Sequence, residues 1–362
     1  MAAGTVSSDK IDLLIHGPRK PIVDNGFSDQ FVLHHCETTH DLERLTPDVA
    51  ARIRGMAVTY NSVRGDARTL SRFPKLEIVS AFGVGYDHVD AAFSRDHGIM
   101  VTNTPDVLTE EVADLAMGLL IATLREFVKA DRYLRSGLWS AQNLPLSVGS
   151  LRDRKVGMVG MGRIGQAIAR RLEASLVPVV YHTRNPAADV SYQHYPDLIE
   201  MAKAVDTLVV IVPGGASTAK MINAEVMKAL GPRGVIINVA RGTVVDEQAL
   251  IAALKSGTIL AAGLDVFERE PNVPDELKAM QNVVLLPHIG SASVVTRNAM
   301  DQLVVDNLLA WFAGKPPLTP VAETPAKARE GCSCSFASLA CSQCSSPSCS
   351  PDIRPARRMP GT

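Results

Sequence analysis

Short apolar runs recur along the first hundred residues, and each is followed by a polar stretch long enough to form a turn or a helix. Runs of aliphatic and β-branched residues between turn residues are typical of buried strands in a parallel sheet. The pattern therefore predicts a first α/β unit with strands at Ile11–Ile15, Phe31–His35, Met56–Tyr60, Leu76–Ala81 and Ile99–Thr102.

A long helical pattern follows, starting near Asp106 and predicted to run to about Ser136, before Gly137. Thr109 can cap its start, and Glu110 in the first turn favours the helix dipole. We expect this helix to link the first unit to the next.

A second and stronger series of strands is predicted at Val156–Val159, Pro178–His182, Thr207–Val212, Val235–Val239, Ala261–Val266 and Val283–Leu286. Strands at this spacing, with helices between them, indicate βαβ units. The expected fold class is α/β, with two Rossmann-like or flavodoxin-like doubly wound parallel sheets. A last amphipathic helix is predicted over Ser293–Phe312, before Gly314.

Composition supports a two-domain globular protein that binds neither nucleic acid nor membrane. The chain has 362 residues, 46% of them hydrophobic, and a formal net charge of −1. Two domains suit this length, and the near-zero net charge does not indicate a basic surface that would bind nucleic acid. The run Leu115–Leu124 is too short to cross a bilayer, and Met1–Lys10 has no secretory pattern. We expect a cytoplasmic protein.

From about Thr324 the sequence becomes rich in Ser, Cys, Pro and Arg, without apolar periodicity. Cys332, Cys334, Cys341 and Cys344 form pairs that resemble a zinc site, which is the alternative interpretation. The spacing of these cysteines is irregular, and no histidine follows His288. Both observations favour a disordered tail over 323–362 without metal.

A glycine-rich loop joins the first strand of the second series to a helix: Gly160-Met-Gly162-Arg163-Ile164-Gly165. Gly160 permits a tight turn, Gly162 lets backbone N–H groups approach a pyrophosphate, and Gly165 allows close helix packing. Arg163 adds a cation near the phosphates or is simply a solvated surface residue. The motif predicts a dinucleotide site.

The end of the next strand indicates which dinucleotide is preferred. An NAD site usually has a carboxylate there, but this chain has Thr183 and Arg184. A hydroxyl and a guanidinium suit a 2′-phosphate, so NADP(H) is favoured, with NAD(H) as an alternative. An exposed loop arginine without a ligand would look the same in the sequence.

Polar residues follow three later strands: Arg241, Glu270 and His288. Such residues lie at the edge where open α/β sheets bind ligands. Reduction of a carbonyl by a nicotinamide needs a proton for the oxygen, a cation for an anionic substrate, and a group that keeps the proton donor charged. These three side chains can supply those functions.

These segments, with Val79–Asp87 and Thr102–Pro105, resemble the D-isomer-specific 2-hydroxyacid dehydrogenase family over roughly residues 10 to 321. Within it, the chain is most similar to the glyoxylate/hydroxypyruvate reductase branch, which includes aryl-pyruvate reductases. The resemblance implies reduction of a small 2-oxo acid to a 2-hydroxy acid.

The resemblance also implies roles for single residues. His288 would be the acid/base, Glu270 would hydrogen-bond its imidazole, and Arg241 would bind the substrate carboxylate and carbonyl oxygen. A neighbouring carboxylate favours the imidazolium, and a planar guanidinium matches a 2-oxo acid. The backbone N–H groups of Val84 and Gly85 would hold the carboxylate from the other domain.

Further cofactor contacts are implied for Val212, Pro213, Ala240, Asp265, His288 and Ser291. Asp265 would contact the nicotinamide amide; the alternative is that it caps the following turn. Val212 and Pro213 would lie beside the adenosine, or would only end a strand.

The expected organisation is a discontinuous substrate domain, 1–104 plus 288–322, with a dinucleotide-binding domain, 105–287, inserted in it and a cleft between them. A homodimer is expected from the resemblance; Trp139 would be core, interface, or a wall of the partner's active site. Alternatives are a hydroxyphenylpyruvate reductase, another enzyme of this family, and a nucleotide-sensing co-repressor of the same fold.

Overall fold

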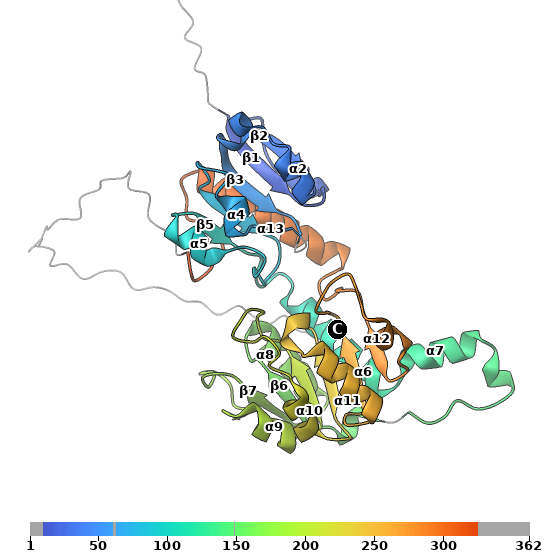
Figure 1. The fold of residues 1–362 in the computed structure, drawn as a ribbon. Helices are drawn as coiled ribbons and strands as arrows, with labels where there is room; N and C mark the ends of the chain where they lie inside the picture. The colour runs from blue at the N-terminus through green and yellow to red at the C-terminus, as the bar shows by residue number, and fades with distance from the viewer. Residues whose placement is uncertain (1–9, 61–62, 148, 325–362) are drawn as a thin grey trace, which may run out of the picture. The chain divides into compact units, whose positions relative to one another are not determined.

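The computed structural model describes residues 10–60, 63–147 and 149–324. Its first sheet contains five parallel strands in the order β2-β1-β3-β4-β5 (Figure 1). The strands are β1 Ile11–His16, β2 Phe31–Cys36, β3 Ile53–Val58, β4 Ile78–Ala81 and β5 Met100–Thr102. This flavodoxin-like order confirms the predicted first α/β unit.

Short helices connect these strands, namely α1 Pro21–Asn25, α2 Thr39–Glu43, α3 Pro47–Ala50, α4 Ala67–Leu70 and α5 Ala91–Asp96. The side chains of Thr38, Thr46, Asp66 and Asp90 cap four of them by accepting backbone N–H groups. Because such short helices gain little from propensity, capping and packing stabilise them.

The second sheet has seven parallel strands in the order β12-β11-β10-β9-β6-β7-β8. The strands are β6 Val156–Val159, β7 Val179–His182, β8 Gln193–His194, β9 Thr207–Val210, β10 Val235–Asn238, β11 Ala261–Leu264 and β12 Val283–Leu285. The order reverses between β6 and β9, so the ligand-binding crevice of this doubly wound sheet is expected there. The six predicted strands are present, and β8 is an addition.

The helices between these strands are α8 Arg163–Ala174, α9 Leu198–Ala204, α10 Ala224–Leu230, α11 Glu247–Ser256 and α12 Asp275–Ala279. Two hydrophobic clusters pack on the sheet, and its strands β6, β9, β10 and β11 are buried along their whole length. Burial on both faces explains why the strands appear as continuous apolar runs.

The predicted linking helix is two helices, so its expected span to Ser136 was wrong. Helix α6, Thr109–Leu124, packs against α8 and β11, and α7, Phe127–Arg135, follows it. The chain breaks at Glu126, whose φ of 51° is left-handed. The side chain of Lys129 donates to Glu126 at 2.9 Å and holds the corner. No glycine or proline marks this break.

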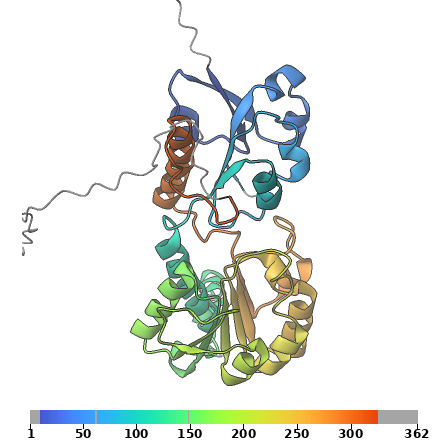
Figure 2. The ribbon, with the colours of Figure 1, turned by 90° about the vertical axis from the view of Figure 1, so that its left-hand side faces the viewer.

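Helix α13, Val294–Phe312, returns to the first sheet from the far end of the chain and packs against α1, β3 and β4. Figure 2 shows this orange helix against the blue strands. The side chain of Ser293 caps its start. The helix matches the predicted span within one residue.

The segment Thr319–Thr324, here called the C-terminal strap, adds to the edge of β5. Val321 N–H donates to Val101 O at 3.0 Å, and Thr102 forms an antiparallel bridge with Pro320. Thr324 is only 4% exposed, and its hydroxyl accepts from Val101 N–H at 2.9 Å. The predicted tail boundary at residue 323 was therefore too early; the remainder of that tail, with the cysteine pairs, lies outside the described residues.

Within the part of the chain that the structure describes, no helix is long and apolar enough to cross a membrane. The same residues contain no group of three or more His, Cys, Asp or Glu side chains arranged to hold a metal ion.

Candidate active site

His288 and Glu270 form a close pair beyond the carboxyl ends of β11 and β12. His288 Nδ1 lies 2.7 Å from Glu270 Oε2 in a hydrogen bond, and Phe267 N–H donates to Glu270 Oε1 at 3.1 Å. Burial raises the pKa of Glu270, but the hydrogen bond and charge of His288 outweigh it, and the net pKa is lowered. The ionised carboxylate thus fixes Nδ1 as the donor and leaves Nε2 as the ring nitrogen available to a substrate.

Asp265 shapes the backbone around His288. His288 has a left-handed φ of 55°, and its N–H donates to the backbone oxygen of Asp265 at 2.8 Å. The carboxylate of Asp265 accepts from Ile289 N–H at 2.7 Å and from Gly290 N–H at 2.8 Å. Burial raises the pKa of this acid. Its observed contacts are those of the turn-capping alternative.

Arg241 follows β10 and is held by its neighbours. Asn238 Nδ2 donates to the backbone oxygen of Arg241 at 3.0 Å, and Arg241 Nη1 donates to Ala240 O at 2.8 Å. Ala240 N–H donates to Asn238 Oδ1 at 3.1 Å. Both backbone groups of Ala240 are thus already used within the protein. The charge of Arg241 contributes to the lowered pKa of Glu270, so it lies within electrostatic range of the pair.

The guanidinium of Arg241 also meets the loop that follows β4. Arg241 Nε donates to Asp87 Oδ1 at 3.0 Å. Burial raises the pKa of Asp87, but the charge and hydrogen bond of Arg241, together with a backbone hydrogen bond and the charge of His88, outweigh burial and lower the net pKa. A Cβ at Gly85 would overlap Arg241 Nη2, so a side chain at this loop position would have to displace the guanidinium. The structure thus brings together Arg241 and Gly85, which were both predicted to bind the substrate carboxylate.

The loop around Gly83 has unused donors. Among the described residues, the backbone N–H groups of Val84 and Gly85 donate to no acceptor. Gly83 has a φ of 123°, which makes the sharp turn possible. Unpaired adjacent N–H groups in a turn are suited to an anion.

The glycine-rich loop has the geometry expected of a dinucleotide site. Gly160 has a φ of 107°, and a Cβ there would lie 2.5 Å from Ile211 O. A Cβ at Gly165 would lie 2.5 Å from Gly160 O, whereas Gly162 has no atom near such a position. The loop is therefore tight at both ends and open at Gly162, where the first turn of α8 presents its N–H groups.

The two residues between Gly162 and Gly165 differ in exposure. The side chain of Ile164 is partly buried and packs against the core. Arg163 Nε lies 3.1 Å from Asp106 Oδ1, and both side chains are largely exposed. This ion pair fits the interpretation of Arg163 as a solvated surface residue.

Thr183 and Arg184 lie just beyond β7. Arg184 is exposed and has no hydrogen bond or ion pair with any described residue. The Thr183 hydroxyl donates to Asn185 O at 2.6 Å. His194 Nε2 lies 2.9 Å from Thr183 O, so β8 supports this corner.

The remaining residues singled out from the sequence lie in different environments. Val212 lies beside the glycine-rich loop, 3.1 Å from the position of a Gly160 Cβ, whereas Pro213 is exposed and its oxygen accepts from Thr218 at 2.7 Å. Ser291 is partly buried, and its side chain forms no hydrogen bond with any described residue. Trp139 is 63% exposed, which excludes the core interpretation.

Comparison with known proteins identifies the family of this chain. Residues 117–290 match the family model described as D-isomer specific 2-hydroxyacid dehydrogenase, NAD binding domain. The chain is 46% identical over 314 residues to glyoxylate/hydroxypyruvate reductase A of Arabidopsis thaliana, covering 86% of this chain and 99% of that one. The chain belongs to the D-isomer-specific 2-hydroxyacid dehydrogenase family.

Solved structures support the same assignment. The NADPH-dependent glyoxylate/hydroxypyruvate reductase of Sinorhizobium meliloti, in complex with NADP and malonate, superposes with a TM-score of 0.83 at 53% identity, covering 87% of this chain and 98% of that one. A hydroxyphenylpyruvate reductase of Plectranthus scutellarioides is 50% identical over 266 residues, which is 73% of this chain and 85% of that one.

As a member of this family, the protein is a 2-hydroxyacid dehydrogenase, an oxidoreductase with an NAD-binding domain. The predicted resemblance to the glyoxylate/hydroxypyruvate reductase branch and the two-sheet fold class are confirmed. The predicted dinucleotide cofactor agrees with the family model.

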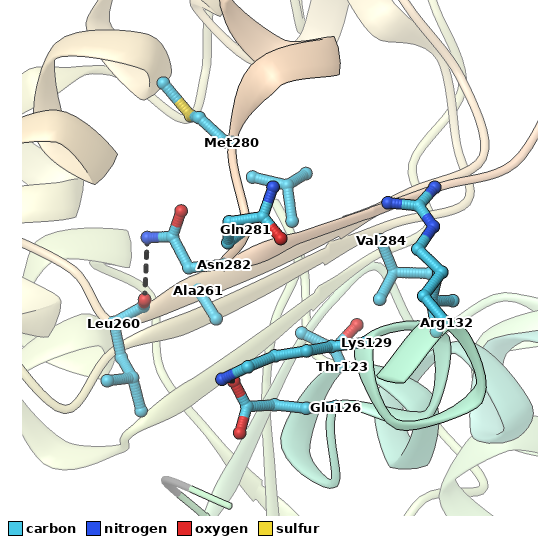
Figure 3. Close-up of a pocket in the computed structure, with 12 residues that line it drawn as sticks. Thr123, Glu126, Lys129, Arg132, Leu260, Ala261, Met280, Gln281, Asn282 and Val284 are labelled. Carbon is cyan, nitrogen blue, oxygen red and sulfur yellow. Dashed lines mark hydrogen bonds and ion pairs between the residues drawn. The ribbon is translucent and has the colours of Figure 1, made fainter. Parts of the chain in front are cut away.

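A cavity of about 130 Å³ lies elsewhere, beneath α7 (Figure 3). Leu260, Ala261 and Asn282 line it where β11 and β12 begin, together with Lys129 and Arg132 of α7. Ligands of parallel sheets bind at the carboxyl ends of strands, which is the opposite edge. None of the predicted site residues lines this cavity.

Sequence reasoning missed Asp87, Asn103 and Asn238 as supports of the site. Asn238 and Asn103 are polar residues at or just beyond the end of a buried strand, and this position is the only signal they carry in the sequence. Asp87 belongs to the Val79–Asp87 motif, but its partner Arg241 is 154 positions away.

Proposed function

We propose that this enzyme catalyses NADPH-dependent reduction of small 2-oxo acids, glyoxylate and hydroxypyruvate first, with His288 as acid/base. The observation that carries the proposal is the 2.7 Å hydrogen bond between His288 Nδ1 and an ionised Glu270. It holds the imidazole in one orientation beside an ionised carboxylate.

In this mechanism Arg241 and the N–H groups of Val84 and Gly85 bind the substrate carboxylate. Arg241 also polarises the carbonyl oxygen, and His288 Nε2–H donates a proton to that oxygen. The reduced nicotinamide, when bound, supplies the hydride that reaches the carbonyl carbon. Glu270 stabilises the imidazolium before transfer and keeps the ring oriented afterwards. In the reverse direction the neutral imidazole accepts the hydroxyl proton.

The proposed cofactor contacts follow the loop geometry. Gly160, Gly162 and Gly165 would admit the pyrophosphate to the start of α8, and Val212 would lie beside the adenosine. Arg184, which has no partner among the described residues, would bind the 2′-phosphate with Thr183. The relative from Sinorhizobium meliloti, described as NADPH-dependent, supports the preference for NADP(H).

The domain organisation and assembly belong to the same proposal. Residues 1–104 plus 288–322 would form the substrate domain, and 105–287 the cofactor domain; the return of α13 to the first sheet supports this division. A homodimer is proposed because α7 and the following turn expose Phe127, Leu134, Leu138 and Trp139. An apolar surface of this kind suits a second copy.

A substrate panel tests the function. Purified protein with NADPH or NADH is assayed against glyoxylate, hydroxypyruvate, hydroxyphenylpyruvate and pyruvate. The proposal expects the highest kcat/KM for glyoxylate or hydroxypyruvate with NADPH. Preference for hydroxyphenylpyruvate would favour the second candidate, which the identity to the Plectranthus enzyme supports. Absence of reductase activity with all four substrates would favour a nucleotide-sensing binding protein.

A further inference from the structure

The substrate loop, Gly83–Gly85, is fixed to the end of the neighbouring strand. Gly83 N–H donates to Thr104 Oγ1 at 2.9 Å, and Thr104 N–H donates to Gly83 O at 2.9 Å. Thr104 is fully buried. Thr104 therefore satisfies both the N–H and the carbonyl group of Gly83.

Asn103 continues this attachment by one residue. Its Nδ2 donates to Val84 O at 2.8 Å, so the carbonyl groups of Gly83 and Val84 are both engaged by residues 103–104. The N–H groups of Val84 and Gly85 have no acceptor among the described residues. The peptide planes of the loop are thus held through their oxygens, while their donors stay available.

Asn103 is itself anchored by the C-terminal strap. Asn103 N–H donates to Thr319 O at 3.2 Å, and the Thr319 hydroxyl donates to Asn103 O at 2.6 Å. Asn307 of α13, fully buried, donates to Thr319 Oγ1 at 2.9 Å and accepts from Thr319 N–H at 3.0 Å. A continuous chain of hydrogen bonds therefore runs from α13 through Thr319 and Asn103 to the substrate loop.

We propose that Asn103 is a positioning residue for substrate binding. It acts through Val84, whose carbonyl it holds, and so fixes the orientation of the N–H groups that receive the carboxylate. This inference rests on the proposed function, since it assigns Val84 and Gly85 to the carboxylate. Donors fixed before binding lose less conformational freedom when the anion arrives, and this increases affinity.

Two variants test the bond. Asn103→Ala removes the donor, and Asn103→Asp keeps the shape but points an acceptor at the Val84 carbonyl. We expect KM for the 2-oxo acid and the dissociation constant of malonate, used as an unreactive dicarboxylate, to rise about threefold to tenfold in the alanine variant. The aspartate variant should lose more. kcat at saturating substrate and KM for NADPH should change less than twofold.

Asn282→Ala is the matched control, because Asn282 Nδ2 also donates to a backbone oxygen, that of Leu260 at 3.1 Å (Figure 3). It should lower Tm comparably and leave KM and malonate binding unchanged. If Asn103→Ala lowers Tm but leaves both constants at wild-type values, the residue is merely structural and the inference is overturned. A wild-type protein that neither reduces a 2-oxo acid nor binds malonate would overturn the proposed function and this inference together.

Discussion

Glu270 holds His288 with one carboxylate oxygen and the backbone with the other. Oε2 lies 2.7 Å from His288 Nδ1, and Oε1 accepts from Phe267 N–H at 3.1 Å. Glu270→Gln preserves the shape and removes the carboxylate charge beside the imidazole. We expect kcat for reduction to fall about tenfold or more. An unchanged kcat would contradict this role; stopped-flow or steady-state rates provide the measurement.

His288→Asn tests the proton donor directly. Asparagine tolerates the left-handed backbone, with φ of 55°, better than most residues, so loss of activity can be separated from loss of fold. We expect kcat to fall about 10²- to 10⁴-fold while NADPH binding, measured by quenching of protein fluorescence, remains. Retention of more than a tenth of the wild-type turnover would exclude His288 as the acid/base.

Arg184→Ala tests the choice of cofactor. Because Arg184 is exposed and has no partner among the described residues, its removal should leave the fold unchanged. Loss of a charge-assisted hydrogen bond should raise KM for NADPH about tenfold or more, and KM for NADH far less. Arg68→Ala, an exposed arginine on α4, serves as the control. Equal effects on both cofactors would contradict the assignment.

Burial of His88 should make the folded protein less stable in acid. It is 7% exposed, and burial lowers its pKa to about 4, with Arg241 and Arg64 acting in the same direction against Asp87. The unfolded chain binds this proton near pH 6.5, so stability is complete above that value and falls as the pH decreases toward 4. The expected loss from this group is about 2 kcal/mol at pH 5.

Urea unfolding of the wild type and of His88→Asn at pH 7.5 and pH 5 measures this effect. His16 is also buried with a lowered pKa, so the difference between the two proteins isolates His88. The variant should show a smaller fall between the two pH values. Parallel losses in both proteins would assign the acid sensitivity to other groups.

Two truncations test the contacts of the C-terminal strap. Ending the protein after Thr324 should leave Tm and activity unchanged. Ending it after Ala322 removes the bonds of Thr324 to Val101 and of Glu323 Oε2 to the Tyr86 hydroxyl, the latter 2.8 Å long. We expect Tm to fall roughly 2–4 °C, as for a loss of about 1 kcal/mol. Equal Tm values for the two truncations would show that these bonds contribute nothing.

The strands could be predicted because parallel strands buried on both faces leave continuous apolar runs. β8 could not be predicted, because Gln193–His194 is a two-residue edge strand without such a run. The break at Glu126 also carries no sequence signal, since tertiary packing and not glycine or proline determines it. Local sequence patterns predict buried strands well, but they predict breaks between helices poorly.

The site was predictable where chemistry and spacing coincide, as in Gly160–Gly165 and in Glu270 with His288. The supporting contacts were not predictable, because they join positions far apart in the chain. Asp87 and Arg241 illustrate this: each is polar and near a strand end, but only the folded chain shows that they meet. For Asp265, the sequence left two interpretations, and both carboxylate oxygens prove to be occupied by the turn.

The C-terminal strap has a consequence for self-association. A bare edge strand presents unpaired N–H and C=O groups that can recruit another chain. Thr319–Thr324 occupies that edge of β5, and Pro320 and the preceding Pro316 and Pro317 have no N–H with which to extend the pairing. A protein lacking the strap would therefore expose a template for edge-to-edge aggregation, and its solubility at high concentration would be lost even where single molecules remain folded.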